Sequence, residues 1–392
     1  MRVLIDYRPA LRERSGVGEY THELARALLA LYPRSADGDS LELTLFSSSW
    51  KDRLSPAPEL AGAARIDRRV PVSVLNLAWH RLGWPPIEVV AGGRFDVAHS
   101  SHPLLMPSQD AAQIVTIHDL DFLAHPERTG AEIRRDYPHL VGKHARRADA
   151  VIVSSSFTAA EVERQLGVAR ERIAVCPHGA PDWAPRPETP ANGYILFFGT
   201  LEPRKNVGGL LDTYERIITR QRDHDPAEAG RYGNIPELVL AGRATDAARP
   251  WLDRIARRPL AGRVRYIGYV ERSTRRELYA GARLLVQPSF EEGFGITVLE
   301  AMSVGVPVVA AARGSLPEVA GDAAIFVDPD KPDDIARGIE RLLDDDRVAA
   351  ECTAKGLARA QAFSWRSTAR RVYETYRRAV ARRNAECGMR NK

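Results

Sequence analysis

The chain of 392 residues has only three cysteines, Cys176, Cys352 and Cys387, and none of them forms a C-x-x-C pair. A small, odd and scattered set of cysteines favours a reducing compartment over a disulfide framework. The sequence also lacks a hydrophobic run long enough to span a bilayer. Its first apolar run is interrupted at Asp6, which predicts a first strand and not a signal peptide. We therefore expect a cytoplasmic protein.

Charge of one sign is not in large excess. The chain has 56 lysine and arginine residues against 51 aspartate and glutamate residues, which gives a formal net charge of +5. This mildly basic balance permits anionic ligands or an anionic membrane surface, and no signature of nucleic-acid binding accompanies it. The length suffices for two α/β domains with substantial cores, and a hydrophobic content of 44% is typical of a soluble globular protein.

The most informative stretch follows the apolar run at residues 282–286, which predicts a buried strand. After it, Gly293 and Gly295 let the backbone approach a ligand without an intervening Cβ. A short helix is predicted to begin near Ile296, so that its free N–H groups and the positive end of its dipole face the same loop. Phosphate is the ligand that such a place favours.

Two carboxylates flank this turn. Glu292 lies on the loop, and Glu300 lies about one turn into the predicted helix. A carboxylate cannot usefully approach phosphate, so we expect both to accept hydrogen bonds from hydroxyl groups. A nucleoside diphosphate sugar, with a diphosphate in the middle and a polyol at each end, would satisfy every group here. The alternative is that Glu292 caps the helix and Glu300 is a solvated helix residue.

A glycine turn with Gly16 and Gly18 separates the first predicted strand from the first predicted helix, where doubly wound folds place ligands. A dinucleotide fingerprint would need a third glycine at the position of Thr21, so a nicotinamide enzyme is disfavoured. A plain turn without a ligand is the alternative for this pair of glycines.

His118 ends the fourth predicted strand, at the carboxyl end where a parallel sheet faces its ligand. Its imidazole can donate to or accept from sugar hydroxyls, and it can change protonation near neutral pH. The alternative is a histidine held by loop hydrogen bonds.

Two further surfaces have more than one interpretation. The aromatic patch Trp79–Trp84 is either an acceptor-side surface or a packing element. The basic stretch from Arg134 to Arg147 is either a solvated face or a surface for a phosphate-bearing or lipid-linked acceptor, or for the anionic inner leaflet of a membrane.

Four prolines between residues 180 and 192 predict an interdomain linker, after which the strand–helix scheme starts again at Tyr194. The predicted domains are 1–184 and 185–365, with the cleft between them as the default binding site. Arg204 and Lys205 follow the first strand of the second domain. There they can neutralise a diphosphate and stabilise the charge that grows on a leaving nucleotide, without a metal.

The spacing of Glu292 and Glu300 around Gly-Phe-Gly resembles the E-x7-E element of retaining glycosyltransferases of family 4, and the run 292–302 is similar to that family almost letter for letter. The resemblance implies an α/β GT-B fold, in which two Rossmann-like, doubly wound domains face a central cleft. It also implies that a C-terminal helix, 366–392, packs back on the first domain. The implied activity is metal-independent hexosyl transfer from a nucleotide sugar to a hydroxyl of a glycan or lipid-linked glycan, as in polysaccharide biosynthesis.

The resemblance also implies residue roles. His118 lies beside the transferred sugar, Glu292 binds hydroxyls of that sugar, and Glu300 holds the ribose. The remaining implied contacts with the donor come from Gly16, Gly18, Arg204, Lys205, Tyr269, Val270, Gly293, Phe294, Gly295, Ile296 and Thr297. Much of the family has an arginine where this chain has Thr200, and Arg204 is expected to supply the missing charge.

The donor that the resemblance favours is GDP-mannose, from the segments Thr116–Leu120 and Gly199–Asn206 taken together. UDP-glucose and UDP-N-acetylglucosamine are open alternatives, because main-chain recognition of the base leaves almost no side-chain trace. A sugar-nucleotide epimerase of similar architecture and a catalytically idle nucleotide-sugar binding subunit are the other classes that fit the sequence.

Overall fold

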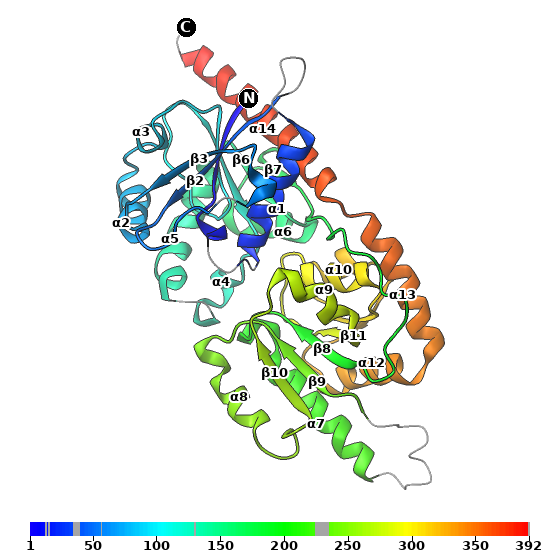
Figure 1. The fold of residues 1–392 in the computed structure, drawn as a ribbon. Coiled ribbons are helices and arrows are strands. Elements are labelled where there is room, and N and C mark those ends of the chain that lie inside the picture. The colour runs from blue at the N-terminus through cyan, green and yellow to red at the C-terminus, as the bar shows by residue number, and fades with distance from the viewer. Residues whose placement is uncertain are drawn as a thin grey trace. The chain divides into compact units, whose positions relative to one another are not determined.

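The computed structural model describes residues 1–11, 14, 16–33, 40–55, 57–128, 131–223 and 235–390. The chain divides into two compact units (Figure 1). The first comprises Met1–Gly179 with Ser364–Lys392, and the second comprises Ala180–Phe363. The boundaries therefore fall at 179/180 and 363/364, where the sequence analysis placed them at 184/185 and 365/366.

Within the described residues, the first unit is built on a parallel sheet of seven strands in the order β3-β2-β1-β4-β5-β6-β7. The strand order runs outward from β1 in both directions, which is the arrangement of a doubly wound fold. The strands are β1 (Arg2–Asp6), β2 (Glu42–Ser48), β3 (Ala64–Arg68), β4 (Val97–Ser100), β5 (Ala112–Ile117), β6 (Ala150–Val153) and β7 (Ile173–Val175). The predicted parallel sheet is confirmed, although β3 was not among the predicted strands.

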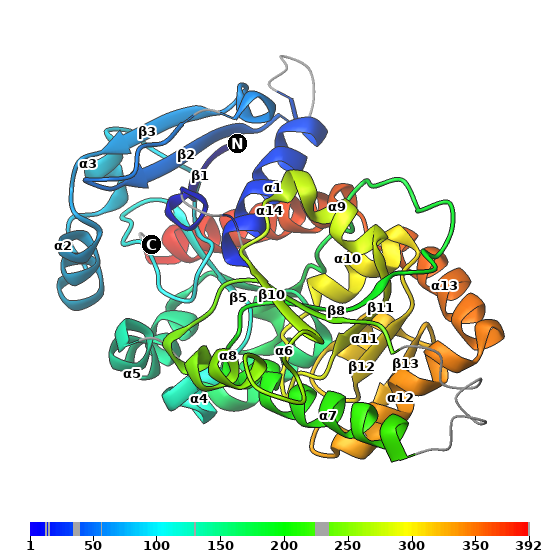
Figure 2. The same ribbon diagram turned by 60° about the horizontal axis from the view of Figure 1, so that its bottom comes forward.

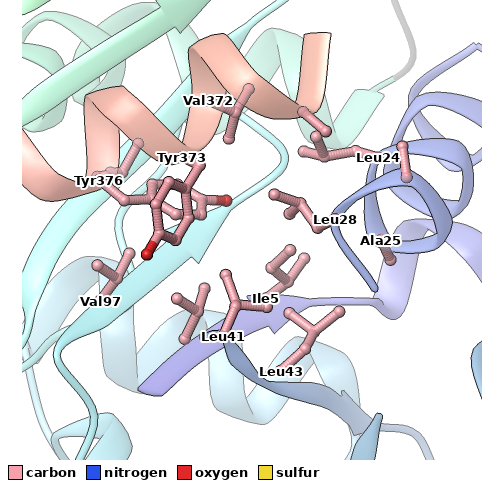
Figure 3. Packing of buried hydrophobic residues seen from close by; sticks show 14 of the residues in the cluster. Ile5, Leu24, Ala25, Leu28, Leu41, Leu43, Val97, Val372, Tyr373 and Tyr376 are labelled. Atoms are coloured by element: carbon pink, nitrogen blue, oxygen red, sulfur yellow. The ribbon is translucent and has the colours of Figure 1, made fainter. Parts of the chain in front are cut away.

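Helices connect these strands and cover the sheet. They are α1 (Val17–Leu31), α2 (Val72–Leu77), α3 (Ile87–Ala91), α4 (Asp121–Ala124), α5 (Ala131–Arg147), α6 (Ser156–Leu166) and, from the end of the chain, α14 (Trp365–Arg390). In the core, Leu24 and Leu28 of α1 lie four residues apart on one helix face, as do Val372 and Tyr376 of α14. Figure 3 shows these side chains packed around Ile5 of β1, in one buried cluster.

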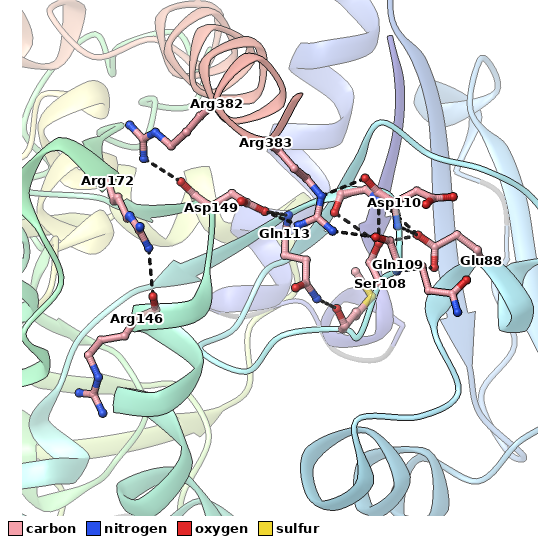
Figure 4. A network of polar contacts seen from close by, with 12 residues as sticks. Glu88, Ser108, Gln109, Asp110, Gln113, Arg146, Asp149, Arg172, Arg382 and Arg383 are labelled. Carbon is pink, nitrogen blue, oxygen red and sulfur yellow. Dashed lines mark hydrogen bonds and ion pairs between the residues drawn. The ribbon is translucent and has the colours of Figure 1, made fainter. Parts of the chain in front are cut away.

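Arginines near the end of α14 fasten this helix to the first unit (Figure 4). The Arg383 guanidinium donates to the carbonyl oxygens of Gln109 at 2.8 Å and Asp110 at 3.0 Å, and to the Asp149 carboxylate at 3.2 Å. Arg382 donates to the Asp149 carbonyl at 3.3 Å. These contacts join the C-terminal helix to the loops that precede β5 and β6, so the last helix of the chain completes the first unit.

The second unit has its own parallel sheet, of six strands among the described residues, in the order β10-β9-β8-β11-β12-β13. The strands are β8 (Tyr194–Phe198), β9 (Leu238–Ala241), β10 (Val264–Gly268), β11 (Ala282–Gln287), β12 (Val308–Ala311) and β13 (Ala324–Val327). The helices are α7 (Val207–Asp223), α8 (Arg249–Ile255), α9 (Arg272–Ala280), α10 (Ile296–Val304), α11 (Leu316–Ala320), α12 (Pro332–Asp344) and α13 (Asp346–Gln361). Figure 2 shows β8 beside β11, which brings the loops after these two strands together.

Among the described helices of both units, none combines the length and the apolar composition that crossing a bilayer requires.

Candidate active site

The predicted strand–loop–helix stretch forms as expected, with β11 ending at Gln287 and α10 beginning at Ile296. Gly295 precedes the helix in a left-handed conformation, with φ of +91°. The backbone angle favours glycine, and a Cβ at this position would lie 2.5 Å from Cδ2 of Leu316, so that the leucine side chain would have to move. The N–H groups of Ile296 and Thr297 begin the helix and therefore have no acceptor within it.

Glu292 lies buried in the loop, with 5% of its surface exposed. Its Oε1 accepts hydrogen bonds from Lys205 Nζ at 2.5 Å, Ser289 Oγ at 2.8 Å and Gln287 Nε2 at 2.8 Å. Arg204 Nη1 lies 3.3 Å from its Oε2. Burial alone raises the pKa of this carboxyl, but the charges of Lys205 and Arg204 outweigh burial and hold the pKa at about 2. Glu292 is therefore an anion at neutral pH.

The two cations predicted to hold a diphosphate both lie in this cluster. Arg204 donates through Nη1 to the Glu291 carbonyl at 2.8 Å and through Nη2 to Glu202 Oε1 at 2.9 Å, in addition to its contact with Glu292. With Lys205, the cluster has two positive and two negative side chains. The sequence did not predict this pairing. Among the described residues, no group of three or more His, Cys, Asp or Glu side chains could hold a metal ion.

Glu300 lies on α10 and is also buried, with 6% of its surface exposed. The Tyr279 hydroxyl donates to its Oε2 at 2.7 Å, and Arg275 Nη1 lies 3.7 Å from its Oε1. Burial and the neighbouring Glu300 charge raise the pKa of Tyr279 well above its usual value. The alternative of a solvated Glu300 is therefore wrong. Glu292 does not cap α10 either, because Gly295 occupies the cap position and no side chain caps it.

The other residues of this unit that were predicted to contact the sugar donor are Phe294, Val270 and Tyr269, and their side chains pack against the protein interior to different degrees. Phe294 is buried, and its ring meets the Phe363 ring edge-on with centroids 5.8 Å apart. Val270 belongs to the same apolar cluster as Phe294. The residue before it, Tyr269, directly follows β10 and is half-buried. The main chain of Gly293, Phe294 and Val270 is the part that a ligand could use.

In the first unit, His118 directly follows β5. Its Nε2 lies 3.1 Å from the Ser101 carbonyl oxygen, so this nitrogen is the donor and Nδ1 is left as an acceptor. The His118 ring stands edge-on to the Tyr20 ring, with centroids 4.9 Å apart and an interplanar angle of 80°. Burial lowers the pKa of His118, which favours the neutral ring at pH 7. The structure thus shows a loop hydrogen bond that holds the ring and fixes its tautomer.

The glycine turn of the first unit has a structural explanation at both positions. Gly16 caps α1 with φ of +51°, in a conformation that glycine adopts most readily. A Cβ on Gly18 would lie 2.5 Å from the Pro9 carbonyl oxygen, so α1 packs closely on the preceding turn. Both glycines are accounted for without a ligand, as in the plain-turn alternative. Ser15, in the same turn, lies outside the described residues.

A buried charged cluster at the end of β1 was not predicted. Arg8 donates to both oxygens of Asp6, through Nη2 at 2.6 Å and Nε at 2.8 Å, and His102 Nε2 lies 3.1 Å from Asp6 Oδ2. Burial raises the pKa of Asp6, but Arg8 and His102 outweigh it and lower the pKa far below its usual value. The available signal was Asp6 itself, a carboxylate that ends a buried strand.

Comparison with known proteins agrees with the two-unit architecture. Residues 14–182 match the family described as Glycosyltransferase Family 4, and residues 192–345 match the family described as Glycosyl transferases group 1. Over 406 residues the chain is 30% identical to O-antigen chain mannosyltransferase B of Escherichia coli, with 96% of this chain and 100% of that protein covered. A D-inositol 3-phosphate glycosyltransferase of a Nocardioides species is 38% identical over 320 residues, covering 74% of this chain and 68% of the relative.

Among solved structures, sucrose-phosphate synthase from Thermosynechococcus elongatus superimposes with a TM-score of 0.75 at 20% identity, covering 97% of this chain and 99% of the other. Two parallel α/β units of this kind define the GT-B glycosyltransferases, so the predicted fold is confirmed. The chain belongs to glycosyltransferase family 4, and it is a glycosyltransferase.

Proposed function

We propose that this enzyme transfers mannose from GDP-mannose, with retention of anomeric configuration, to a hydroxyl of a glycan or lipid-linked glycan. The observation that carries the proposal is the contact of the buried Glu292 with the partly buried Arg204 and Lys205, in the loop that leads to the amino end of α10. The similarity to an O-antigen chain mannosyltransferase along nearly the whole chain supports mannose as the sugar and a polysaccharide as the product.

The charge balance of the cluster suggests how the donor is held. Arg204 and Lys205 are neutralised by carboxylates, and a diphosphate brings further negative charge. In the proposed complex both cations turn part of their hydrogen bonding from Glu292 to the diphosphate, while the N–H groups of Ile296 and Thr297 bind phosphate oxygens. The Glu292 oxygens released by this exchange accept hydrogen bonds from hydroxyls of the sugar.

The second carboxylate suits the other end of the donor. Glu300 is buried beside Arg275, and the Tyr279 hydroxyl fixes one of its oxygens. Arg275 Nη1 lies 3.7 Å from the other oxygen, and because a carboxylate oxygen can accept more than one hydrogen bond, we assign this group to the ribose hydroxyls. The two glutamates therefore serve two different parts of the donor, and they are not a hydrolase pair astride the scissile bond.

Retention is proposed without a covalent intermediate. Three donors already occupy Oε1 of Glu292, and its pKa of about 2 makes it a weak nucleophile and no proton donor at neutral pH. We infer instead that the acceptor attacks the face from which the nucleotide departs, with the leaving phosphate taking the hydroxyl proton. The neutral His118 ring, with Nδ1 as an acceptor, is assigned to a hydroxyl of the transferred sugar.

Other candidates remain as outcomes of the test. The similarity to a D-inositol 3-phosphate glycosyltransferase favours a phosphorylated polyol as a second acceptor class. UDP-glucose and UDP-N-acetylglucosamine are the alternative donors, and an epimerase or an idle binding subunit would need no acceptor.

The test is nucleotide release from GDP-mannose, UDP-glucose and UDP-N-acetylglucosamine, each with no acceptor, with a glycan extract and with inositol 3-phosphate. We expect GDP release from GDP-mannose only when the glycan extract is present, and an α-linked product by NMR. Release of UDP from UDP-N-acetylglucosamine without acceptor would identify an epimerase. Nucleotide-sugar binding without any release would identify a binding subunit, and a β-linked product would exclude retention.

A further inference from the structure

Large apolar side chains that reach solvent are concentrated in one part of the first unit. Among the described residues, the large apolar side chains with high exposure all lie between residues 50 and 89. Leu82 is 74% exposed and Trp84 is 65% exposed. Apart from Trp50, they are Val70, Val72, Val74, Leu77, Leu82, Trp84 and Val89. Single exposed apolar residues are common on soluble proteins, but such a concentration in one short segment marks an interaction surface.

The inner side of α2 is firmly held. Leu75 and Trp79 are buried in an apolar cluster, and the Trp79 indole N–H donates to the Pro85 carbonyl at 2.9 Å. Arg8 Nη1 donates to Asn76 Oδ1 at 2.9 Å, and the Arg8 guanidinium lies 5.0 Å from the centre of the Trp79 ring. Because Arg8 follows β1, these contacts fix α2 at the carboxyl edge of the first sheet.

The outer side of the same segment consists of the exposed residues. Val74 and Leu77 lie three residues apart, so they share the face of α2 that is turned away from Leu75. Leu82 ends the following helical turn, and Trp84 comes two residues later. The predicted aromatic patch is thus divided, since Trp79 packs inside and Trp84 faces solvent. Figures 1 and 2 both show α2 at the periphery of its unit.

The same segment of the chain contains four exposed arginines. Arg65, Arg69, Arg81 and Arg94 are exposed, and the described structure gives none of them a carboxylate partner. Only two acidic residues occur between positions 65 and 94, and both are engaged. Asp67 accepts from Ser47 Oγ and pairs with Arg53 at 2.9 Å, and Glu88 accepts from Ser108 Oγ and from the main chain of the loop before β5.

We propose that this apolar–arginine face, Val70–Val89 with Arg65, Arg69, Arg81 and Arg94, docks on an anionic lipid bilayer. The apolar side chains enter the boundary between headgroups and acyl chains, and the arginines bind lipid phosphates. Trp84 suits this boundary because its ring is apolar and its indole N–H is a donor. Unpaired cations without a free carboxylate fit a uniformly anionic surface better than a protein partner, whose surface mixes both signs.

The location on the fold gives the proposal a functional consequence. A bilayer bound at α2 would lie next to the carboxyl edge of the first sheet, where lipid-linked acceptors could reach the enzyme from the membrane. The face differs from the basic stretch in α5 that the sequence suggested. There Arg146 donates to the Leu166 carbonyl, and the side chains of Arg134 and Arg135 lie outside the described residues. The inference goes beyond the proposed function and requires neither a mannose donor nor a glycan acceptor.

The test is co-sedimentation of the full chain with vesicles of phosphatidylcholine and phosphatidylglycerol in equal parts, compared with phosphatidylcholine alone. We expect binding to the anionic vesicles that weakens as salt is raised. The variants Val74→Ser/Leu77→Ser and Arg69→Glu/Arg81→Glu should each lower the partition coefficient about tenfold or more. The matched control is Arg257→Glu/Arg258→Glu, two exposed arginines of the second unit, which should bind as the unaltered protein does.

Three results would overturn the proposal. They are no sedimentation with either vesicle, equal sedimentation of all variants, or a dimer by light scattering that Val74→Ser/Leu77→Ser converts to a monomer. The last result would assign the face to a second copy of the chain. Circular dichroism and nucleotide affinity should be unchanged in every variant, because the substituted side chains are exposed and lie outside the nucleotide site. Vesicle binding that persists without glycosyl transfer would refute the proposed function alone.

Discussion

The carboxyl edges of the two sheets differ in the kind of side chain that they present. In the second unit, Glu292, Arg204 and Lys205 form a charged cluster in which each group has a partner of opposite sign. In the first unit, the edge near His118 is lined by neutral rings, among them His178 and Tyr20. A charged, preformed network suits a diphosphate, whereas neutral rings with fixed donors and acceptors suit sugar hydroxyls. Under the proposed function, the second unit would bind the diphosphate, and the first unit, apart from its Asp6 cluster, would offer neutral groups to sugar hydroxyls.

The ring cluster of the first unit is held together by burial. The His178 ring stacks on Trp365 at 5.8 Å, and its other neighbour Tyr20 lies 4.9 Å away. His99 contacts the Tyr376 hydroxyl through Nδ1 at 2.7 Å and Thr116 Oγ1 through Nε2 at 2.8 Å. Burial lowers the pKa of His99 to about 3 and that of His178 well below its usual value. These histidines are neutral in the folded protein across the physiological pH range.

The largest effect is expected for Glu292→Ala. If the charged cluster orients the transferred sugar, turnover should fall about 10²- to 10³-fold, as when one preorganised polar contact to a transition state is lost. Affinity for the free nucleotide should be retained or rise, because Arg204 and Lys205 lose the carboxylate with which the diphosphate competes. Steady-state transfer assays and calorimetric titration with nucleotide measure the two quantities separately.

The control is Glu271→Ala, which removes an exposed carboxylate of the same unit and should change neither quantity. Thermal unfolding must be followed as well, because removing Glu292 takes away a buried carboxylate that two poorly exposed cations contact. Unchanged turnover in a folded Glu292→Ala protein would remove the assignment of this carboxylate to the sugar.

The two units also differ in how far the sequence predicts them. Residues 287–300 lie on one strand–loop–helix turn, so their proximity follows from local structure. Arg204 follows β8, a strand that pairs with β11, and the sequence placed it correctly at a strand's carboxyl end. Its pairing with Glu292 depends on the paths of two loops, which no local pattern specifies. Tyr279 lies on α9, and its spacing from Glu300 carries no helical or strand periodicity.

In the first unit, the carboxyl edge of the sheet collects residues that are far apart in the chain. His102 reaches Asp6 because β4 pairs with β1, and Tyr376 reaches His99 from the C-terminal helix. Pattern reading also missed α2, because it assumes that apolar side chains are buried. Val74 and Leu77 break that assumption, which is why this part of the molecule carries an inference that periodicity could not supply.

The stability of the two units should respond differently to acid. His99 titrates at about pH 3 in the folded state but near its usual value when unfolded, so lowering the pH below about 6.5 favours unfolding. The cost approaches about 1.4 kcal/mol per pH unit for each such histidine. Glu292 behaves differently, because its pKa is lowered to about 2 from 4.5. Its contribution to stability is complete above about pH 4.5 and is lost only as the pH falls toward about 2.

Between about pH 7 and pH 5, amide hydrogen exchange of the full chain, corrected for intrinsic rates, should therefore accelerate in β4 and β5 and not in β11 and β12. His99→Gln keeps hydrogen-bonding groups but cannot titrate, so it should reduce the pH dependence of the first unit. Protection in β11 that falls before protection in β4 would reverse the comparison.

The smallest effect is expected for Tyr279→Phe, which tests whether the second unit uses Glu300 for ribose. The change removes the hydroxyl that donates to Glu300 at 2.7 Å and keeps Arg275, whose Nη1 lies 3.7 Å from the same carboxylate. A less firmly oriented carboxylate should weaken nucleotide binding about five- to tenfold, the size expected for one hydrogen bond to a charged group.

A 2′,3′-dideoxy nucleotide should bind equally well to the Tyr279→Phe variant and to the unaltered protein. Tyr266→Phe, which removes a hydroxyl bonded to the Gly242 carbonyl, is the matched control. An equal loss for the dideoxy analogue would mean that Tyr279 supports the fold of the unit and that Glu300 does not read the ribose.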